Sequence, residues 1–124
     1  MDTAVKTRTL SDQVLSVLAQ YAFSLNDEKK LQAEISEILE ANNIPHRREV
    51  ALNKKDIIDF LFEDGTGLEI KIKGQRFSIY RQLRRYAESN EVSEIILATA
   101  ISMGLPSSIE GKPARVFSLS RAHL

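Results

Sequence analysis

The stretch of residues 56–73 most constrains the fold, because it predicts two strands joined by a tight turn. Its two ends are rich in aliphatic side chains, and Asp64-Gly65, a pair typical of hairpin turns, lies between them. In the second strand, aliphatic and charged side chains alternate, which places Glu69 and Lys71 on the same face. In the first strand, Asp59 interrupts an apolar face. A carboxylate in that position needs either a partner or a function.

The length of the connection decides whether Asp59 and Glu69 can lie together. A two-residue turn at Asp64-Gly65 would place Asp59 opposite Ile70, and Glu69 would then point to the other face of the sheet. A connection longer by one residue, with a glycine in the left-handed region, would pair Asp59 with Lys71. We expect this longer, bulged hairpin, in which the three polar side chains converge.

Two carboxylates and a lysine at one point of a sheet form a candidate site for a hard cation. Oxygen ligands select Mg²⁺ or Mn²⁺ over thiophilic metals, and Mg²⁺ is commonly held by one or two carboxylates while water and substrate phosphate complete its shell. We therefore expect Asp59 and Glu69 to hold Mg²⁺ or Mn²⁺. The alternative is an exposed hairpin with solvated charges, since Glu-X-Lys alone occurs often by chance.

The arrangement of Asp59 followed after a loop by Glu69-Ile70-Lys71 resembles the PD-(D/E)XK nuclease superfamily. The proline that usually precedes the acid in that family is replaced here by Ile58. The resemblance, which extends to Holliday-junction resolvases and RecB-like nuclease domains, implies a restriction-endonuclease-like αβββαβ core. It implies that Asp59, Glu69 and the backbone carbonyl of Ile70 bind the metal. It also implies that Lys71 orients the attacking water or stabilises the transition state.

The same resemblance implies roles for three more residues. Gln82, eleven residues after Lys71, and Tyr86 form the Gln-X-X-X-Tyr pattern, in which the glutamine reaches toward the site and the tyrosine packs or contacts substrate. Glu34 resembles the glutamate that the helix before the first core strand often offers to the metal. The alternatives are a core tyrosine with an exposed glutamine, and a solvated helix glutamate.

A basic stretch follows the predicted carboxylate pair. The chain has no net charge, with 17 basic and 17 acidic residues, but no acidic residue lies between Lys71 and Arg85. A basic surface beside a metal site suits a phosphodiester substrate, so we expect DNA as the partner. The residues expected to contact it are Lys73, Arg76, Arg81, Arg84, Arg85 and Tyr86.

Length and composition limit the classes of protein and the kinds of site that this chain can form. The 124 residues predict a single domain, 1–124, and 43% hydrophobic and 27% charged residues are ordinary for a globular protein. The absence of cysteine excludes disulfides and thiolate metal sites. No apolar run approaches a membrane span, and the first residues lack the apolar core of a signal peptide. We therefore expect a cytoplasmic protein.

Periodicity predicts the order of α/β elements, and the resemblance implies that they form a mixed central sheet flanked by helices. The expected helices span about 10–25, 27–43 and 76–90, the strands span 44–52, 57–62, 68–73, 94–100 and 114–119, and a loop spans 103–113. The core covers about 27–100, with an extra N-terminal helix and a C-terminal strand. Phe77, Tyr80, Leu83 and Ala87 are expected to face inward. The first helix is apolar on two sides, which fits either a homodimer or a helix sandwiched within the monomer.

The predicted activity is Mg²⁺-dependent endo- or exonucleolytic cleavage of DNA. A chain this short leaves little room for sequence recognition, so we expect a structure-selective nuclease or one directed by a protein partner. Two alternatives remain open. One is a non-catalytic nucleic-acid-binding or assembly subunit with the same fold, and the other is a small interaction domain that binds no nucleic acid.

Overall fold

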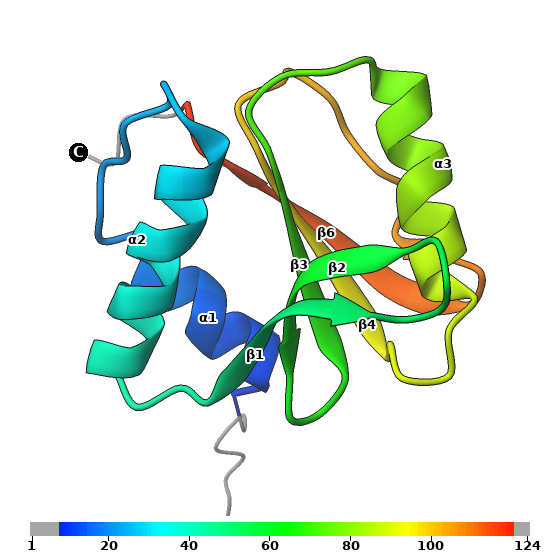
Figure 1. Ribbon diagram of the computed structural model, residues 1–124, viewed down its shortest axis with the longest axis horizontal. Coiled ribbons are helices and arrows are strands. Elements are labelled where there is room, and N and C mark those ends of the chain that lie inside the picture. The colour runs from blue at the N-terminus through cyan, green and yellow to red at the C-terminus, as the bar shows by residue number, and fades with distance from the viewer. Residues whose placement is uncertain (1–7, 121–124) are drawn as a thin grey trace, which may run out of the picture.

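The computed structural model describes residues 8–120 and shows a mixed six-stranded sheet with helices on both faces (Figure 1). The helices are α1 (Leu10–Leu18), α2 (Glu28–Ala41) and α3 (Arg76–Ala87), and the strands are β1 (His46–Ala51), β2 (Ile57–Phe62), β3 (Thr66–Lys71), β4 (Glu94–Thr99), β5 (Ser108–Ile109) and β6 (Lys112–Ser118). The α/β class is confirmed. From α2 to β4 the order of elements is αβββαβ, as expected, with α1 before it and β6 after it.

The sheet has the order β1-β2-β3-β4-β6-β5. β1, β2 and β3 form an antiparallel meander, whereas β4 and β6 run parallel to β3. A parallel neighbour requires a crossover connection, and α3 supplies it between β3 and β4. The central strands β3 and β4 are almost entirely buried, which explains why residues 94–99 form a nearly continuous apolar run.

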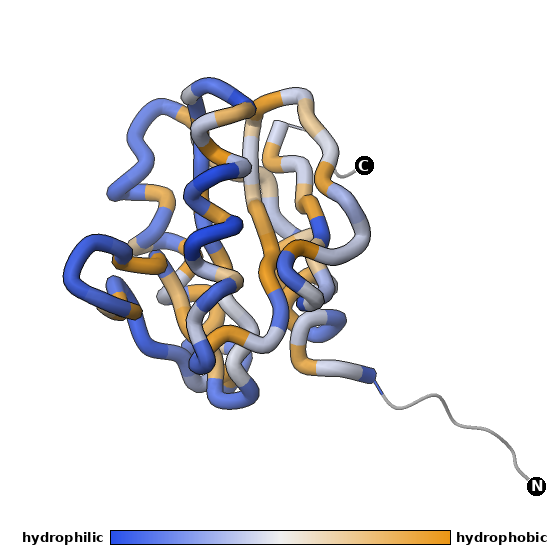
Figure 2. Tube along the Cα trace, turned by 90° about the vertical axis from the view of Figure 1, so that its right-hand side faces the viewer, coloured by the Kyte–Doolittle hydropathy of each residue, from blue (hydrophilic) through white to orange (hydrophobic). Residues whose placement is uncertain are grey.

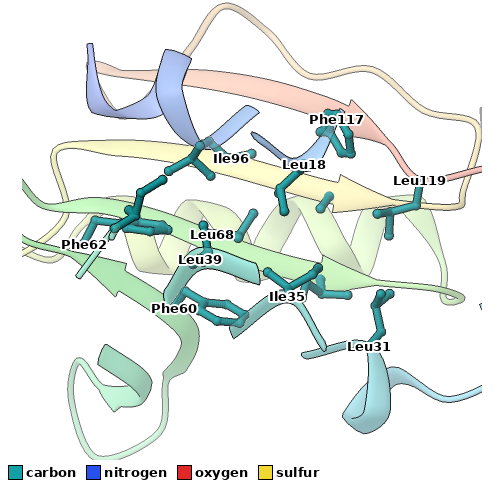
Figure 3. Close-up of a cluster of buried hydrophobic side chains, with 14 residues drawn as sticks. Leu18, Leu31, Ile35, Leu39, Phe60, Phe62, Leu68, Ile96, Phe117 and Leu119 are labelled. Atoms are coloured by element: carbon teal, nitrogen blue, oxygen red, sulfur yellow. The ribbon is translucent and has the colours of Figure 1, made fainter. Parts of the chain in front are cut away.

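Two hydrophobic clusters hold the layers together. On one face, Leu18, Ile35 and Leu39 from α1 and α2 pack on Phe60 and other side chains of the sheet (Figure 3). On the opposite face, α3 covers a second cluster that includes its own Leu83 and Tyr86. Hydrophobic residues lie mainly along the inner strands, and the outer turns of the helices are hydrophilic (Figure 2). Within residues 8–120, no helix is both long and apolar enough to cross a bilayer.

The first helix is shorter than expected. It begins at a capping box formed by Thr9 and Asp12 and ends at Leu18, although the spacing predicted a helix to residue 25. Beyond Leu18 the apolar residues do not share a buried face: Tyr21 is exposed, and Phe23 packs against the first cluster from an irregular segment. The two-sided apolar surface of α1 is used within the chain, because its partly buried side chains pack against the same cluster.

Two other expectations about the elements are wrong. α3 ends at Ala87, and Phe77 is 67% exposed instead of facing inward, because the buried stripe of this helix passes through Ile79 and Leu83. The segment 103–113 is not entirely a loop, since β5 and β6 form a short hairpin. Its turn residues Glu110 and Gly111 both have positive φ values of 50° and 78°, the signature of a tight hairpin turn.

The β2–β3 hairpin has a connection of three residues, Glu63–Gly65, one longer than a two-residue turn, as expected. The expected pairing is nevertheless wrong, because the loop includes Glu63 and leaves Thr66 in the strand. Phe60 pairs with Leu68, and this register places Asp59 opposite Glu69 instead of opposite Lys71. The Asp64 side chain accepts a hydrogen bond from the Thr66 N–H at 2.9 Å, which stabilises this choice of turn.

Gly65 is the residue of this turn that tolerates a side chain least. Its φ is +90°, and an added Cβ would lie 2.9 Å from the Glu91 carbonyl oxygen, a backbone atom. We expect Gly65→Ala to lower the free energy of unfolding by roughly 3 kcal/mol, because strain and overpacking combine. Gly111→Ala is the matched control: its φ is +78° but an added Cβ meets no atom within 4 Å. It should cost only about 1 kcal/mol. Chemical denaturation of both variants measures the difference, and equal losses would contradict it.

Candidate metal and active site

The site lies where β2 and β3 separate. Their backbone pairing covers Leu61–Gly67 and Phe60–Leu68, and at the next position carboxylates replace the backbone partners. The Asp59 N–H donates to Oε1 of Glu69 at 3.1 Å, and the Ile70 N–H donates to Oδ2 of Asp59 at 2.8 Å. The two acidic side chains therefore interlock across the gap between the strands. Their convergence was predicted, although from a different register.

The gap also exposes a backbone carbonyl. In an extended strand the N–H and the C=O of one residue point to the same edge. Because the Ile70 N–H reaches Asp59 on β2, the Ile70 carbonyl faces the same gap. This is the position expected for a backbone oxygen ligand. Asp59, Glu69 and Ile70 thus supply three oxygen donors at one place.

The acid that α2 contributes to this region is Glu28 and not Glu34. Oε1 of Glu28 accepts a hydrogen bond from the Ile72 N–H at 3.0 Å, on the same edge of β3 that holds Asp59. Glu34 is half-buried, and its side chain makes no hydrogen bond within the described residues. Its expected place at the metal is wrong, because within residues 8–120 no third acidic side chain lies close enough to Asp59 and Glu69 to share an ion with them. Glu28 was identifiable in the sequence only as a first-turn acid that suits the helix dipole.

Lys71 and Tyr86 both contact the carboxylate of Glu69. Nζ of Lys71 lies 3.5 Å from Oε2 of Glu69, and the lysine side chain is 22% exposed. The Tyr86 hydroxyl lies 3.2 Å from the same oxygen and 2.8 Å from the Ile57 carbonyl, to which its proton can be donated. Tyr86 has no exposed surface. The expected contact between Tyr86 and nucleic acid is therefore wrong, and this tyrosine holds Glu69 in place.

The electrostatics of the pair favour a bound cation. Burial, and then the nearby charge of Asp59, raises the pKa of Glu69 to about 8. Burial also raises the pKa of Asp59, and the charge of Glu28 adds to this effect. Two buried carboxyl groups that share a gap cannot both ionise cheaply with only the Lys71 ammonium between them. A divalent ion in the gap would remove this penalty, so the donor set fits Mg²⁺ or Mn²⁺.

The number of acidic ligands is small. Among residues 8–120, no three His, Asp or Glu side chains gather closely enough to share a metal ion. An ion held by two carboxylates and a backbone carbonyl must complete its shell with water or substrate phosphate. This incomplete shell is common for Mg²⁺ at sites of phosphate chemistry.

The other predicted residues lie on α3 or at its start. Gln82 is half-buried, and its side chain makes no hydrogen bond within the described part of the chain, so none joins it to Glu69. Arg84 is paired with Glu110 at 3.1 Å, and Arg85 is paired with the buried Asp56 at 3.0 Å. Lys73, Arg76 and Arg81 are exposed. Of the predicted basic residues, these three are the exposed ones that have no carboxylate partner in the described part of the chain.

The geometry of these side chains is the basis for assigning the site. Comparisons of the chain with protein-family models, with curated proteins and with solved structures found no match.

Proposed function

We propose that this protein is a metal-dependent nuclease that hydrolyses DNA phosphodiester bonds. The observation that carries the proposal is the interlocked pair Asp59 and Glu69, with Lys71 3.5 Å from Glu69, in the gap between two core strands. The pair, the Glu-X-Lys spacing and the αβββαβ order together resemble the PD-(D/E)XK nucleases. An exposed hairpin with solvated charges does not fit, because Glu69 is only 3% exposed.

Asp59, Glu69 and the Ile70 carbonyl would hold Mg²⁺ or Mn²⁺. Bound there, such an ion would supply charge neutralisation at a phosphate oxygen and would make a water molecule more acidic. Lys71 places an ammonium group beside Glu69, where it can orient the attacking water and stabilise the negative charge that develops on the phosphate.

The groups around Glu69 fix the orientation of its carboxylate. Oε1 accepts the Asp59 N–H, and Oε2 lies beside the Tyr86 hydroxyl, which is anchored to the Ile57 carbonyl. A ligand held at both oxygens loses little freedom when the ion binds, and such outer contacts tune metal affinity.

Basic side chains would hold the DNA backbone. Lys73, Arg76 and Arg81 are exposed and can contact phosphates directly, whereas Arg84 and Arg85 would first have to leave their carboxylate partners. Phosphate contacts position DNA without reading its sequence. We therefore propose that the nuclease selects its substrate by DNA structure or is directed to it by a protein partner. A second copy of this chain is one such partner.

The proposal is tested with end-labelled linear, forked and four-way DNA. Wild-type protein should cleave at least one of these in Mg²⁺ or Mn²⁺, and an excess of EDTA should stop cleavage. Gel analysis of the products separates cleavage within a strand from cleavage at an end. DNA binding without cleavage in any divalent metal would contradict the proposal and favour a nucleic-acid-binding or assembly subunit.

A further inference from the structure

Phe77 is a large hydrophobic side chain that the fold leaves in solvent. It is 67% exposed, the highest value among the large hydrophobic residues of the described chain. The guanidinium carbon of Arg81, one turn later, lies 4.8 Å from the centre of its ring. A cation over one part of an exposed aromatic ring makes a platform on which another planar group can stack.

Phe77 also forms part of a hollow in the surface. The hollow has a volume of about 510 Å³, and Arg76, Tyr80, Met103 and Gly104 line it together with Phe77 and Ser102. Its walls therefore combine two aromatic rings, a thioether and a guanidinium group. The volume lies within the range of about 300–1,000 Å³ that small-ligand sites occupy.

The position of the hollow connects it to the candidate metal site. One wall is the start of α3, which follows β3 after the short connection 72–75, and the other is the segment that leaves β4. The two strands are joined at this end, because the Thr99 hydroxyl donates to the Lys71 carbonyl at 2.6 Å. Both walls of the hollow thus begin beside Lys71.

The charge around the hollow is of one sign. The residues that line the hollow belong to the segments 71–87 and 95–109, and neither segment contains Asp or Glu. Arg76 is held at the rim, because its Nε donates to the Ser102 carbonyl at 2.9 Å. A second copy of the same face would bring like charges together, which opposes self-association. An anionic ligand with a planar apolar part fits the hollow better.

We propose that this hollow binds an unpaired nucleobase, which stacks on Phe77 while Arg76 and Arg81 contact the flanking phosphates. Bases within a duplex are stacked on one another and cannot offer a face to the ring, so the ligand is a single-stranded segment. The placement of that strand for cleavage rests on the proposed nuclease function. The substrate would be DNA with an unpaired segment next to the bond that is cleaved.

Binding is measured by fluorescence anisotropy with labelled oligo(dT) and with a duplex of the same length, in EDTA so that no cleavage occurs. Phe77→Ala should weaken binding of the single strand roughly 5- to 150-fold, the range for loss of one stacked base. It should leave duplex binding within about twofold, and Phe77→Trp should retain single-strand binding.

Two further variants separate stacking from folding defects. Gly104→Glu places a carboxylate at the hollow without a steric conflict, because a Cβ at Gly104 meets no atom within 4 Å. It should also weaken single-strand binding. Tyr21→Ala is the matched control, because Tyr21 is an exposed aromatic residue that precedes α2, away from α3. It should leave binding unchanged.

Several results would overturn the inference. These are no single-strand binding by the wild type, equal losses for single strand and duplex in Phe77→Ala, and a concentration-dependent dimer that Phe77→Ala disperses. The inference and the nuclease proposal can fail separately. Single-strand binding through Phe77 without cleavage in any metal would support the inference and contradict the nuclease proposal. Duplex cleavage that Phe77→Ala does not affect, together with no single-strand binding, would support the nuclease proposal and contradict the inference.

Discussion

Replacement of Lys71 by alanine is expected to lower the rate of DNA cleavage by roughly 100- to 10,000-fold, the contribution typical of a positioned group in general acid–base catalysis. The side chain is one of the three groups that meet in the gap, and its ammonium is the positive charge nearest to Glu69, at 3.5 Å from Oε2. Its loss removes the stabilisation of transition-state charge, whereas DNA affinity should change little. Single-turnover kinetics at saturating Mg²⁺ measure the chemical step directly.

Asp59→Asn should cause a loss of the same order. The amide keeps an oxygen that can accept the hydrogen bond from the Ile70 N–H, so the gap between the strands should keep its shape. The variant lacks the negative charge with which Asp59 would attract a divalent ion. Lys54→Ala, an exposed residue in the connection between β1 and β2, serves as the matched control and should cleave at the wild-type rate. Cleavage that persists in both Lys71→Ala and Asp59→Asn would show that the reaction takes place elsewhere.

The second large effect concerns stability and pH. The metal-free protein should lose stability as the pH rises from about 5 to about 8, and Glu69→Gln should remove most of this loss. Burial raises the pKa of Glu69 from 4.5 to about 8 in the folded protein. Between these values the unfolded chain has released the proton and the folded chain still holds it. Folding then takes up a proton, so stability falls with rising pH, by an amount on the order of 4 kcal/mol.

Denaturation in EDTA at pH 5.5 and pH 8.5 measures this effect. Arg115 lowers the pKa of Asp12, and Lys29 lowers the pKa of Glu49. Burial raises the pKa of Asp56, but hydrogen bonds from Asn53 and Arg85 outweigh it, so this pKa is lowered as well. Those carboxylates are already ionised at pH 5.5 and do not contribute to the difference. Mg²⁺ at pH 8.5 should stabilise the wild type more than Glu69→Gln. The same pH dependence in both proteins would show that Glu69 is not the group that titrates.

Much of the fold follows from local sequence. The acidic cap before α2 and the apolar run of β4 each depend on residues within a few positions of one another, and both elements lie where they were expected. The alternation in β3 likewise placed Glu69 and Lys71 on one face. The turn between β2 and β3 required one more residue than a two-residue hairpin, and Gly65, whose φ is +90°, allowed it. These features are set by backbone conformation and nearest neighbours, which a sequence states directly.

Other features depended on contacts between distant segments. The register of the β2–β3 hairpin depended on which residue entered the turn. In that turn the Gly65 carbonyl accepts a hydrogen bond from the N–H of Ser93, a residue far along the chain. Glu28 and not Glu34 reaches the edge of β3, where its carboxylate accepts the Ile72 N–H, a contact between residues 44 positions apart.

The sequence alone determined the αβββαβ order and named Asp59, Glu69 and Lys71 as partners, because periodicity, caps and spacing are local properties. Only the tertiary structure decided that Tyr86 is buried against Glu69 and that Phe77 remains in solvent. Both residues lie on the same helix, and its rotation over the sheet is fixed by packing with strands that the local pattern does not describe.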